Sequence, residues 1–268
     1  MTYETLDIRQ DDRGAAYVTL NVPDKRNALS AMMIAELTDM AHTLGAARDT
    51  RAIVLFGAGN VFCAGGDLGW MNAQINADRE TRMREARKLA EMLNALNTMP
   101  TPLIGRIHGG AFGGGVGIAC VCDVAIASQD TKFGLTETRL GIIPATIGPY
   151  VVARLGEGKA RRVFMSARIF EAAEAVSLGL VAHAVPSEDL DAAVEAEVAP
   201  YLSVAPGAVG AAKALVRALG PRIDAEVIDE TIRQLADIWE GAEAAQGIDA
   251  FFAKTPAPWI RPDDRTNG

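Results

Sequence analysis

A cluster of glycines is the feature of this sequence that points most directly to chemistry. Seven glycines fall between Gly105 and Gly117, in a chain that has 26 glycines in all. Such a run is costly in backbone entropy, and it makes sense where the backbone itself must approach a ligand. Bare amides at the start of a helix donate hydrogen bonds to a negative oxygen, so the run predicts a turn that binds an oxyanion. A tight turn with close helix–strand packing is the alternative interpretation.

The common signatures of nucleotide and nucleophile sites are absent from this stretch. It contains no GxGxxG, GxxxxGK[ST] or GxSxG motif. Only His42, His108 and His183 could serve a serine or cysteine triad, and His42 and His183 fall within a helical and a strand pattern. A nucleotide-dependent oxidoreductase is therefore a weak hypothesis, because only glycine richness supports it.

Alternating strand and helix patterns surround the turn and would position it. Short apolar runs predict strands at 17–20, 52–56, 103–107 and 124–127. Helical spacing of apolar residues marks 30–44 and 79–97 in the first half, and most of the second half from 158 to 241. The pattern predicts an α/β core over 1–200, followed by a helical C-terminal region over 201–268.

Composition and charge exclude several classes of protein. A chain of 268 residues that is 49% hydrophobic and 22% charged is not globally disordered. Its net charge of −8 gives no overall attraction to nucleic acid. We expect Cys63, Cys120 and Cys122 to be buried small hydrophobes, with no disulfide framework and no metal site. No signal peptide or membrane span is evident, so we expect a cytoplasmic protein with no membrane partner.

Four segments, in this order, resemble the enoyl-CoA hydratase/isomerase (crotonase) superfamily. They are PDKRNAL at 23–29, FCAGGDL at 62–68, the glycine run at 108–117 with CDVAIA at 122–127, and FGLTETRLGIIP at 133–144. The likeness extends from about residue 5 to Trp259. It implies an α/β fold in which a spiral of β-β-α units forms two roughly perpendicular sheets. It also implies C-terminal helices for trimerisation, in a homotrimer or a dimer of trimers.

The resemblance also implies the parts of an acyl-CoA site. The thioester oxygen would lie between the backbone amides of Ala64 and Gly114, and Glu137 would be the catalytic carboxyl group. No cofactor is implied, because coenzyme A is part of the substrate. The residues implied for binding the CoA thioester are Lys25, Arg26, Ala28, Ala64, Gly65, Gly66, Asp67, Leu68, Trp70, Gly114 and Lys254.

Several of these side chains have structural alternatives. The three cations Lys25, Arg26 and Lys254 could be solvated surface residues, and Asp67 could cap a turn or a helix. Trp70 and Met71 could line the acyl pocket or pack in the core. Glu137 could form a salt bridge with Arg139, two residues further along the chain.

Gly117 leaves the reaction open, because many relatives have a glutamate at that position. The segment 113–150 looks most like bacterial methylglutaconyl-CoA and related branched acyl-CoA hydratases. This likeness favours the addition of water across the 2,3 double bond of an enoyl-CoA. The alternatives are double-bond isomerisation with Glu137 as the one base, decarboxylation, hydrolysis, or a CoA-binding oligomer without catalysis.

Other charged side chains could complete the site. Glu80 or Glu85, on the predicted helix after Trp70, could supply a second acid. Arg84 or Arg87 on the same helix could meet a carboxylate of the substrate, although a solvated helix face is the simpler interpretation.

Overall fold

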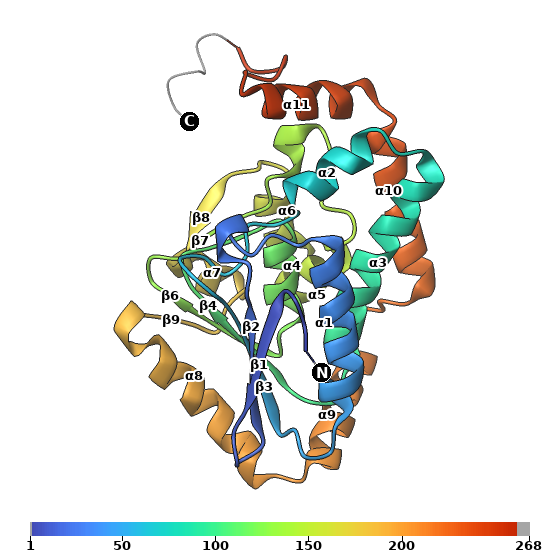
Figure 1. Cartoon of the computed structure of the whole chain (residues 1–268). Helices are drawn as coiled ribbons and strands as arrows, with labels where there is room; N and C mark the ends of the chain where they lie inside the picture. Colours follow the sequence, from blue (N-terminus) through green and yellow to red (C-terminus); the bar gives the residue numbers. More distant parts are fainter. Residues whose placement is uncertain (1, 262–268) are drawn as a thin grey trace.

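The computed structural model describes residues 2–261, and a six-stranded mixed sheet lies at its centre (Figure 1). The strand order is β1-β2-β3-β4-β6-β9, where only the β1–β2 pair is antiparallel. The strands are β1 (Leu6–Gln10), β2 (Ala15–Leu20), β3 (Ala52–Gly57), β4 (Leu103–Ile107), β6 (Val124–Ser128) and β9 (His183–Val185). The inner parallel strands are buried on both faces, as their continuous apolar runs require. The four predicted strands are all confirmed.

A second, smaller sheet has the order β5-β7-β8. Its strands are β5 (Gly110–Phe112), β7 (Lys132–Gly134) and β8 (Ile169–Glu171). Phe133 of β7 stacks on Phe170 of β8 with ring centroids 5.7 Å apart. Three-residue strands are too short to show an alternating pattern, so this sheet was not predicted from periodicity. It holds the glycine turn and the Glu137 segment side by side, because β5 leads to the first and β7 to the second.

Helices cover both faces of the large sheet. α1 (Ala31–Thr43), α3 (Arg79–Thr98), α4 (Gly114–Val121) and α5 (Gly148–Leu155) lie on one side, and α8 (Leu190–Val198) lies on the other. Ser30 caps α1, since its Oγ accepts a hydrogen bond from the Met33 amide at 3.2 Å. The mixed α/β class of the fold is therefore confirmed.

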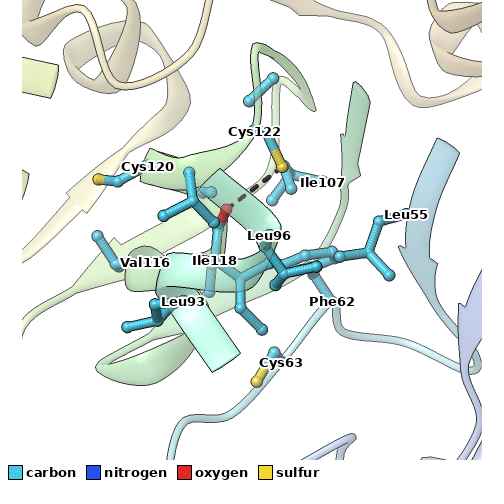
Figure 2. Packing of buried hydrophobic residues seen from close by; sticks show 14 of the residues in the cluster. Leu55, Phe62, Cys63, Leu93, Leu96, Ile107, Val116, Ile118, Cys120 and Cys122 are labelled. Carbon is cyan, nitrogen blue, oxygen red and sulfur yellow. Dashed lines mark hydrogen bonds between the residues drawn. The ribbon is translucent and has the colours of Figure 1, made fainter. Parts of the chain in front are cut away.

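The short helix α4 lies within the main hydrophobic core. Seven of its eight residues are buried, so it has no solvent face. Leu93 and Leu96 of α3 pack beside Val116 and Ile118 of α4 (Figure 2). Such close packing fixes the position of the helix and of the glycine turn from which it begins.

The remaining helices follow in the second half of the chain. They are α6 (Glu157–Phe164), α7 (Ala172–Leu178), α9 (Pro206–Leu219), α10 (Ala225–Trp239) and α11 (Ala242–Ala253). α10 runs beside α3, and α11 packs on the short 3-10 helix η3 (Glu137–Leu140) (Figure 1). The helical character of the C-terminal region is confirmed. The boundary near residue 200 stays a prediction, and residues 262–268 of the predicted region lie outside the described residues.

Two other expectations concern burial and membranes. Cys63, Cys120 and Cys122 are free and buried, and burial raises the pKa of each thiol to about 12. Within residues 2–261, no single helix is long and apolar enough to cross a membrane. The segments 187–203 and 206–219 reach that length and composition only as a pair bent by 112°.

Candidate active site

A pocket of about 420 Å³ brings most of the predicted site residues together. Its wall includes the loop after β3, the start of α4, η3 and parts of α10 and α11. Apolar side chains dominate, and the lining residues with polar side-chain groups are Trp70, Thr136, Glu137, Arg139, Thr146 and Trp239. A larger cavity of about 930 Å³ lies beside α9 and contains none of the predicted site residues. We therefore place the candidate site in the smaller pocket.

The loop at 62–68 is held by two parallel bridges, one from Cys63 to Ala111 and one from Gly66 to Leu29. The Leu29 amide donates to the Gly65 carbonyl at 2.7 Å, and the Asp67 amide donates to the Leu29 carbonyl at 3.1 Å. Because these bonds flank Gly66, the N–H of Gly66 itself points away from Leu29. That N–H has no acceptor among the described residues, and Gly66 lines the pocket.

The amide of Ala64, by contrast, is already occupied. It donates a hydrogen bond to the carbonyl of Arg26 at 3.0 Å. Gly65, with φ of 96°, turns the backbone between this amide and that of Gly66. The prediction that Ala64 holds the thioester oxygen is therefore corrected, and the free amide in this loop belongs to Gly66.

The glycine turn supplies a second free amide at the start of α4. Gly113 has φ of 47°, and its amide donates to the Gly134 carbonyl of β7 at 2.9 Å. Gly114 is the first helical residue, so its N–H has no acceptor within the helix or elsewhere in residues 2–261. A Cβ on Gly65 would lie 3.9 Å from the Gly113 Cα, so the two loops touch. The residues with free amides, Gly66 and Gly114, come directly after the two residues in contact, Gly65 and Gly113.

Glu137 lies at the same corner of the pocket. A Cβ on Gly113 would be 2.9 Å from its Oε1 atom, and its Oε2 atom is buried without a hydrogen-bond partner in the described part of the chain. Burial raises the pKa of Glu137 to about 7. No ion pair joins Glu137 to Arg139 within residues 2–261. The geometry therefore does not support the structural salt bridge as an alternative role.

Ile147 fills the space beside Gly117. A Cβ at position 117 would lie 2.5 Å from Ile147 Cγ2 and 3.7 Å from Leu93 Cδ1. A side chain at this position would therefore require Ile147 to move. The methyl group of Ile147 therefore occupies the space in which a carboxylate side chain at position 117 would lie.

The residues predicted to bind CoA fall into two groups. Leu68, Trp70 and the glycines of the loop line the pocket with Met71, and Ala28 is buried beneath the loop. Asp67 caps α2 (Leu68–Ile75) by accepting from the Trp70 amide at 3.0 Å. Its other oxygen lies 3.3 Å from Lys25 Nζ. A capping role for Asp67 is therefore present, and its contact with CoA stays a prediction.

Two predicted cations lie outside the pocket lining. Arg26 is exposed on the adjoining loop, with its carbonyl bound to Ala64. Lys254 is exposed just after α11, in the left-handed conformation with φ of 55°. Their contact with CoA phosphates stays a prediction.

The charged side chains of α3 do not reach the pocket. Glu85 pairs with Lys88 at 2.7 Å, and Arg87 pairs with Asp229 at 2.6 Å. Arg84 donates to the Thr81 hydroxyl at 3.1 Å, and Glu80 lies in the first turn of the helix. The structure therefore gives no support to a second acid from Glu80 or Glu85, or to a carboxylate contact through Arg84 or Arg87.

Several lining residues were not predicted. Leu235 and Trp239 of α10 and Phe251 of α11 line the pocket, and so do Thr146 and Ile147 from the segment before α5. The spacing of Leu235 and Trp239 on a helix could have indicated a shared apolar face. For Thr146 and Ile147 the sequence has no such signal. No group of three or more His, Cys, Asp or Glu residues that could hold a metal occurs in the part of the chain described.

Comparisons with known proteins agree with the fold. The family model described as enoyl-CoA hydratase/isomerase matches residues 10–262. A probable enoyl-CoA hydratase of Rhodobacter capsulatus is 34% identical over 96% of this chain and 98% of its own length. The crystal structure of an enoyl-CoA hydratase from Shewanella pealeana has a TM-score of 0.78 at 33% identity and covers 96% of each chain. AtuE of Pseudomonas aeruginosa has a TM-score of 0.79 at 38% identity, over 96% of this chain and 100% of that one.

Proposed function

Because the chain belongs to the enoyl-CoA hydratase/isomerase family, we propose that it adds water across the 2,3 double bond of an enoyl-CoA thioester. One observation carries the proposal: two free backbone amides, of Gly66 and Gly114, share an apolar pocket with the buried carboxyl group of Glu137. The hydratase names of the relatives support this choice within the family.

The two amides would bind the thioester oxygen. When a nucleophile adds to C3 of the enoyl group, negative charge moves onto this oxygen. Fixed N–H donors stabilise that charge more than they stabilise the ground-state carbonyl. One such donor lowers the activation barrier by about 2.7–4 kcal/mol. Backbone amides suit this task because the packing of both loops holds them in place before substrate arrives.

Glu137 would move the proton. As the water oxygen bonds to C3, the ionised carboxylate takes a proton from the water, and the electron pair of the double bond passes through C2 to the thioester oxygen. The protonated Glu137 then gives this proton to C2, and the thioester carbonyl forms again. The carboxylate is regenerated, and one water has been added. A pKa of about 7 lets the same group accept and return a proton near neutral pH.

The CoA part of the substrate would lie along the loop at 64–68. Its polar backbone can contact adenine and pantetheine, while Lys25, Arg26 and Lys254 are the candidate partners of the phosphates. Because the reacting group arrives as a thioester of CoA, the proposed reaction needs no separate cofactor.

We also propose assembly into a homotrimer or a dimer of trimers. The support comes from α9, where Leu215, Val216 and Leu219 expose large apolar side chains on one helix. Exposed apolar surface of this kind is characteristic of protein interfaces.

Double-bond isomerisation is the second candidate, and Gly117 is the observation that favours it. With Ile147 beside this glycine, Glu137 is the one carboxylate among the described residues that line the pocket. One base is enough to remove a proton from a 3-enoyl-CoA and return it at another carbon. Hydration remains our first choice because the relatives are named as hydratases.

A screen of enoyl-CoA thioesters tests the proposal. Loss of the conjugated absorbance of a 2-enoyl-CoA indicates hydration, and gain of that absorbance from a 3-enoyl-CoA indicates isomerisation. We expect Glu137→Gln to lower the hydration rate by about 10²–10⁴-fold, because it removes the proton-transfer group. Glu85→Gln is the control, since Glu85 pairs with Lys88 outside the pocket. Undiminished turnover by Glu137→Gln would rule out the mechanism.

A further inference from the structure

The proposed reaction requires a defined position for the attacking water. Glu137 can accept only one of the two protons of that water, and one hydrogen bond leaves the molecule free to rotate. A second acceptor would fix the oxygen lone pair toward C3 and lower the entropy cost of the step. The wall of the pocket is mostly apolar, so few groups can provide it.

A carboxylate at position 117 cannot provide this second acceptor. The residue is glycine, and the methyl group of Ile147 lies 2.5 Å from where its Cβ would be. The two residues together remove both the carboxylate and the room for one. The acceptor must therefore come from another lining residue.

Resting on the proposed hydration, we propose that the hydroxyl group of Thr146 binds the attacking water. Thr146 directly precedes Ile147, so it reaches the pocket from the segment that adjoins position 117. It is 7% exposed, and the small surface that remains open belongs to the pocket wall. Its side chain forms no hydrogen bond with another described residue, so the hydroxyl is available to a ligand.

Among the polar side chains that line the pocket, Thr146 is best suited to accept the second hydrogen bond from the water. The guanidinium of Arg139 has hydrogen-bond donors only, so it cannot accept a hydrogen bond from water. Thr136 also has a hydroxyl group, but it directly precedes Glu137 in the chain, whereas Thr146 adjoins Ile147, the residue packed beside position 117. A threonine hydroxyl has two acceptor lone pairs and one donor. Thr146 can therefore accept a hydrogen bond from one O–H of the water, while Glu137 accepts the proton of the other O–H.

This arrangement gives the hydroxyl a positioning role and no part in proton transfer. The bond from water to C3 forms, the proton passes to Glu137 and then to C2, and Thr146 keeps its own proton throughout. Thr146 should therefore matter for water addition. It should not matter for exchange of C2 protons, which needs only the two amides and Glu137.

Two assays on the full-length protein separate these roles. Thr146→Val replaces the hydroxyl by a methyl group of similar shape, and we expect it to lower kcat for hydration about tenfold, the loss of one hydrogen bond. The same variant should exchange the C2 protons of a saturated acyl-CoA with D2O at the wild-type rate, measured by NMR. Thr146→Ser should recover most of the hydration. Thr138→Val is the matched control, because Thr138 lies outside the pocket and bonds to the Met165 carbonyl at 3.1 Å.

The outcomes distinguish this assignment from the proposed function. If the wild type hydrates and Thr146→Val hydrates equally fast, the Thr146 assignment is wrong and the proposed function stands. If hydration and C2 exchange fall together in Thr146→Val, its role is structural and the assignment is also wrong. If the wild type exchanges C2 protons but hydrates no 2-enoyl-CoA, the proposed function fails, and the Thr146 assignment fails with it.

Discussion

Two walls of the pocket are built in different ways. The loop wall consists of Gly65, Gly66, Gly113 and Gly114, and backbone hydrogen bonds hold it in place. The helical wall consists of Leu235, Trp239 and Phe251, and side chains alone form its surface. The loop wall allows little change at Gly65, where φ is 96° and a Cβ would lie 3.0 Å from the Phe112 carbonyl oxygen.

The helical wall is less constrained. Phe251 is 45% exposed, and α11 packs mainly through Ala244 and Ile248 against the segment at 140–142. We infer that the loop wall determines the reaction and the helical wall determines the acyl group. Chemistry that depends on charge at one oxygen needs fixed donors, whereas recognition of an apolar chain needs only contact area.

The largest expected effect comes from removing one amide of the loop wall. Gly114→Pro deletes the N–H at the first position of α4, where the helix does not use it and proline is tolerated. We expect kcat/KM to fall about 10²–10³-fold, because one donor to the developing oxyanion is lost. Steady-state kinetics with the best 2-enoyl-CoA substrate measure this change.

Gly114→Ala is the matched variant, since it adds a Cβ and keeps the N–H. Its Cβ would meet Leu29 Cδ1 at 2.6 Å, at the far end of a flexible side chain that can move. The alanine variant should lose far less activity than the proline variant. Equal losses would show that the shape of the turn matters and that its N–H does not.

A second effect concerns the pH dependence of the protein's stability, through Glu137 beside the loop wall. Because burial raises the pKa of Glu137 from 4.5 to about 7, the folded protein binds this proton more tightly than the unfolded chain does. Its free energy of unfolding therefore falls as pH rises from about 4.5 to 7. Glu137→Gln removes this penalty, so above pH 7 it should be more stable than wild type by about 3 kcal/mol.

Urea unfolding at several pH values measures this difference. The gap between Glu137→Gln and wild type should be small near pH 4.5 and should reach its full size above pH 7. Glu85→Gln, in an ion pair with Lys88 outside the pocket, should show no such gap. A difference that is constant with pH would mean that the glutamate titrates normally.

The sequence predicted the parts of the molecule that depend on local pattern. Apolar runs located four of the six strands of the large sheet, and helices α1 and α3 are present where expected. The motifs also located Gly114 and Glu137, and the structure brings both to one pocket. Each of these features depends on a few residues that are neighbours in the sequence.

The remaining features depend on contacts between distant segments. Whether the Ala64 or the Gly66 amide is free depends on the left-handed turn at Gly65 and on the Arg26 carbonyl. The packing of Ile147 against Gly117 joins α4 to the turn before α5, and the local sequence does not indicate this contact. Phe251 reaches the pocket only because α11 folds back over η3.

The smallest expected effect lies on the helical wall. Phe251→Ala removes part of the apolar surface of the pocket, so KM for longer acyl chains should rise about fivefold, which corresponds to about 1 kcal/mol of lost contact. kcat should change little, because Gly66, Gly114 and Glu137 are untouched. Phe252→Ala is the matched control, since this neighbour is 40% exposed and does not line the pocket. If Phe251→Ala lowers kcat as strongly as it raises KM, the helical wall also positions the reacting group. The inference that the loop wall alone determines the reaction is then wrong.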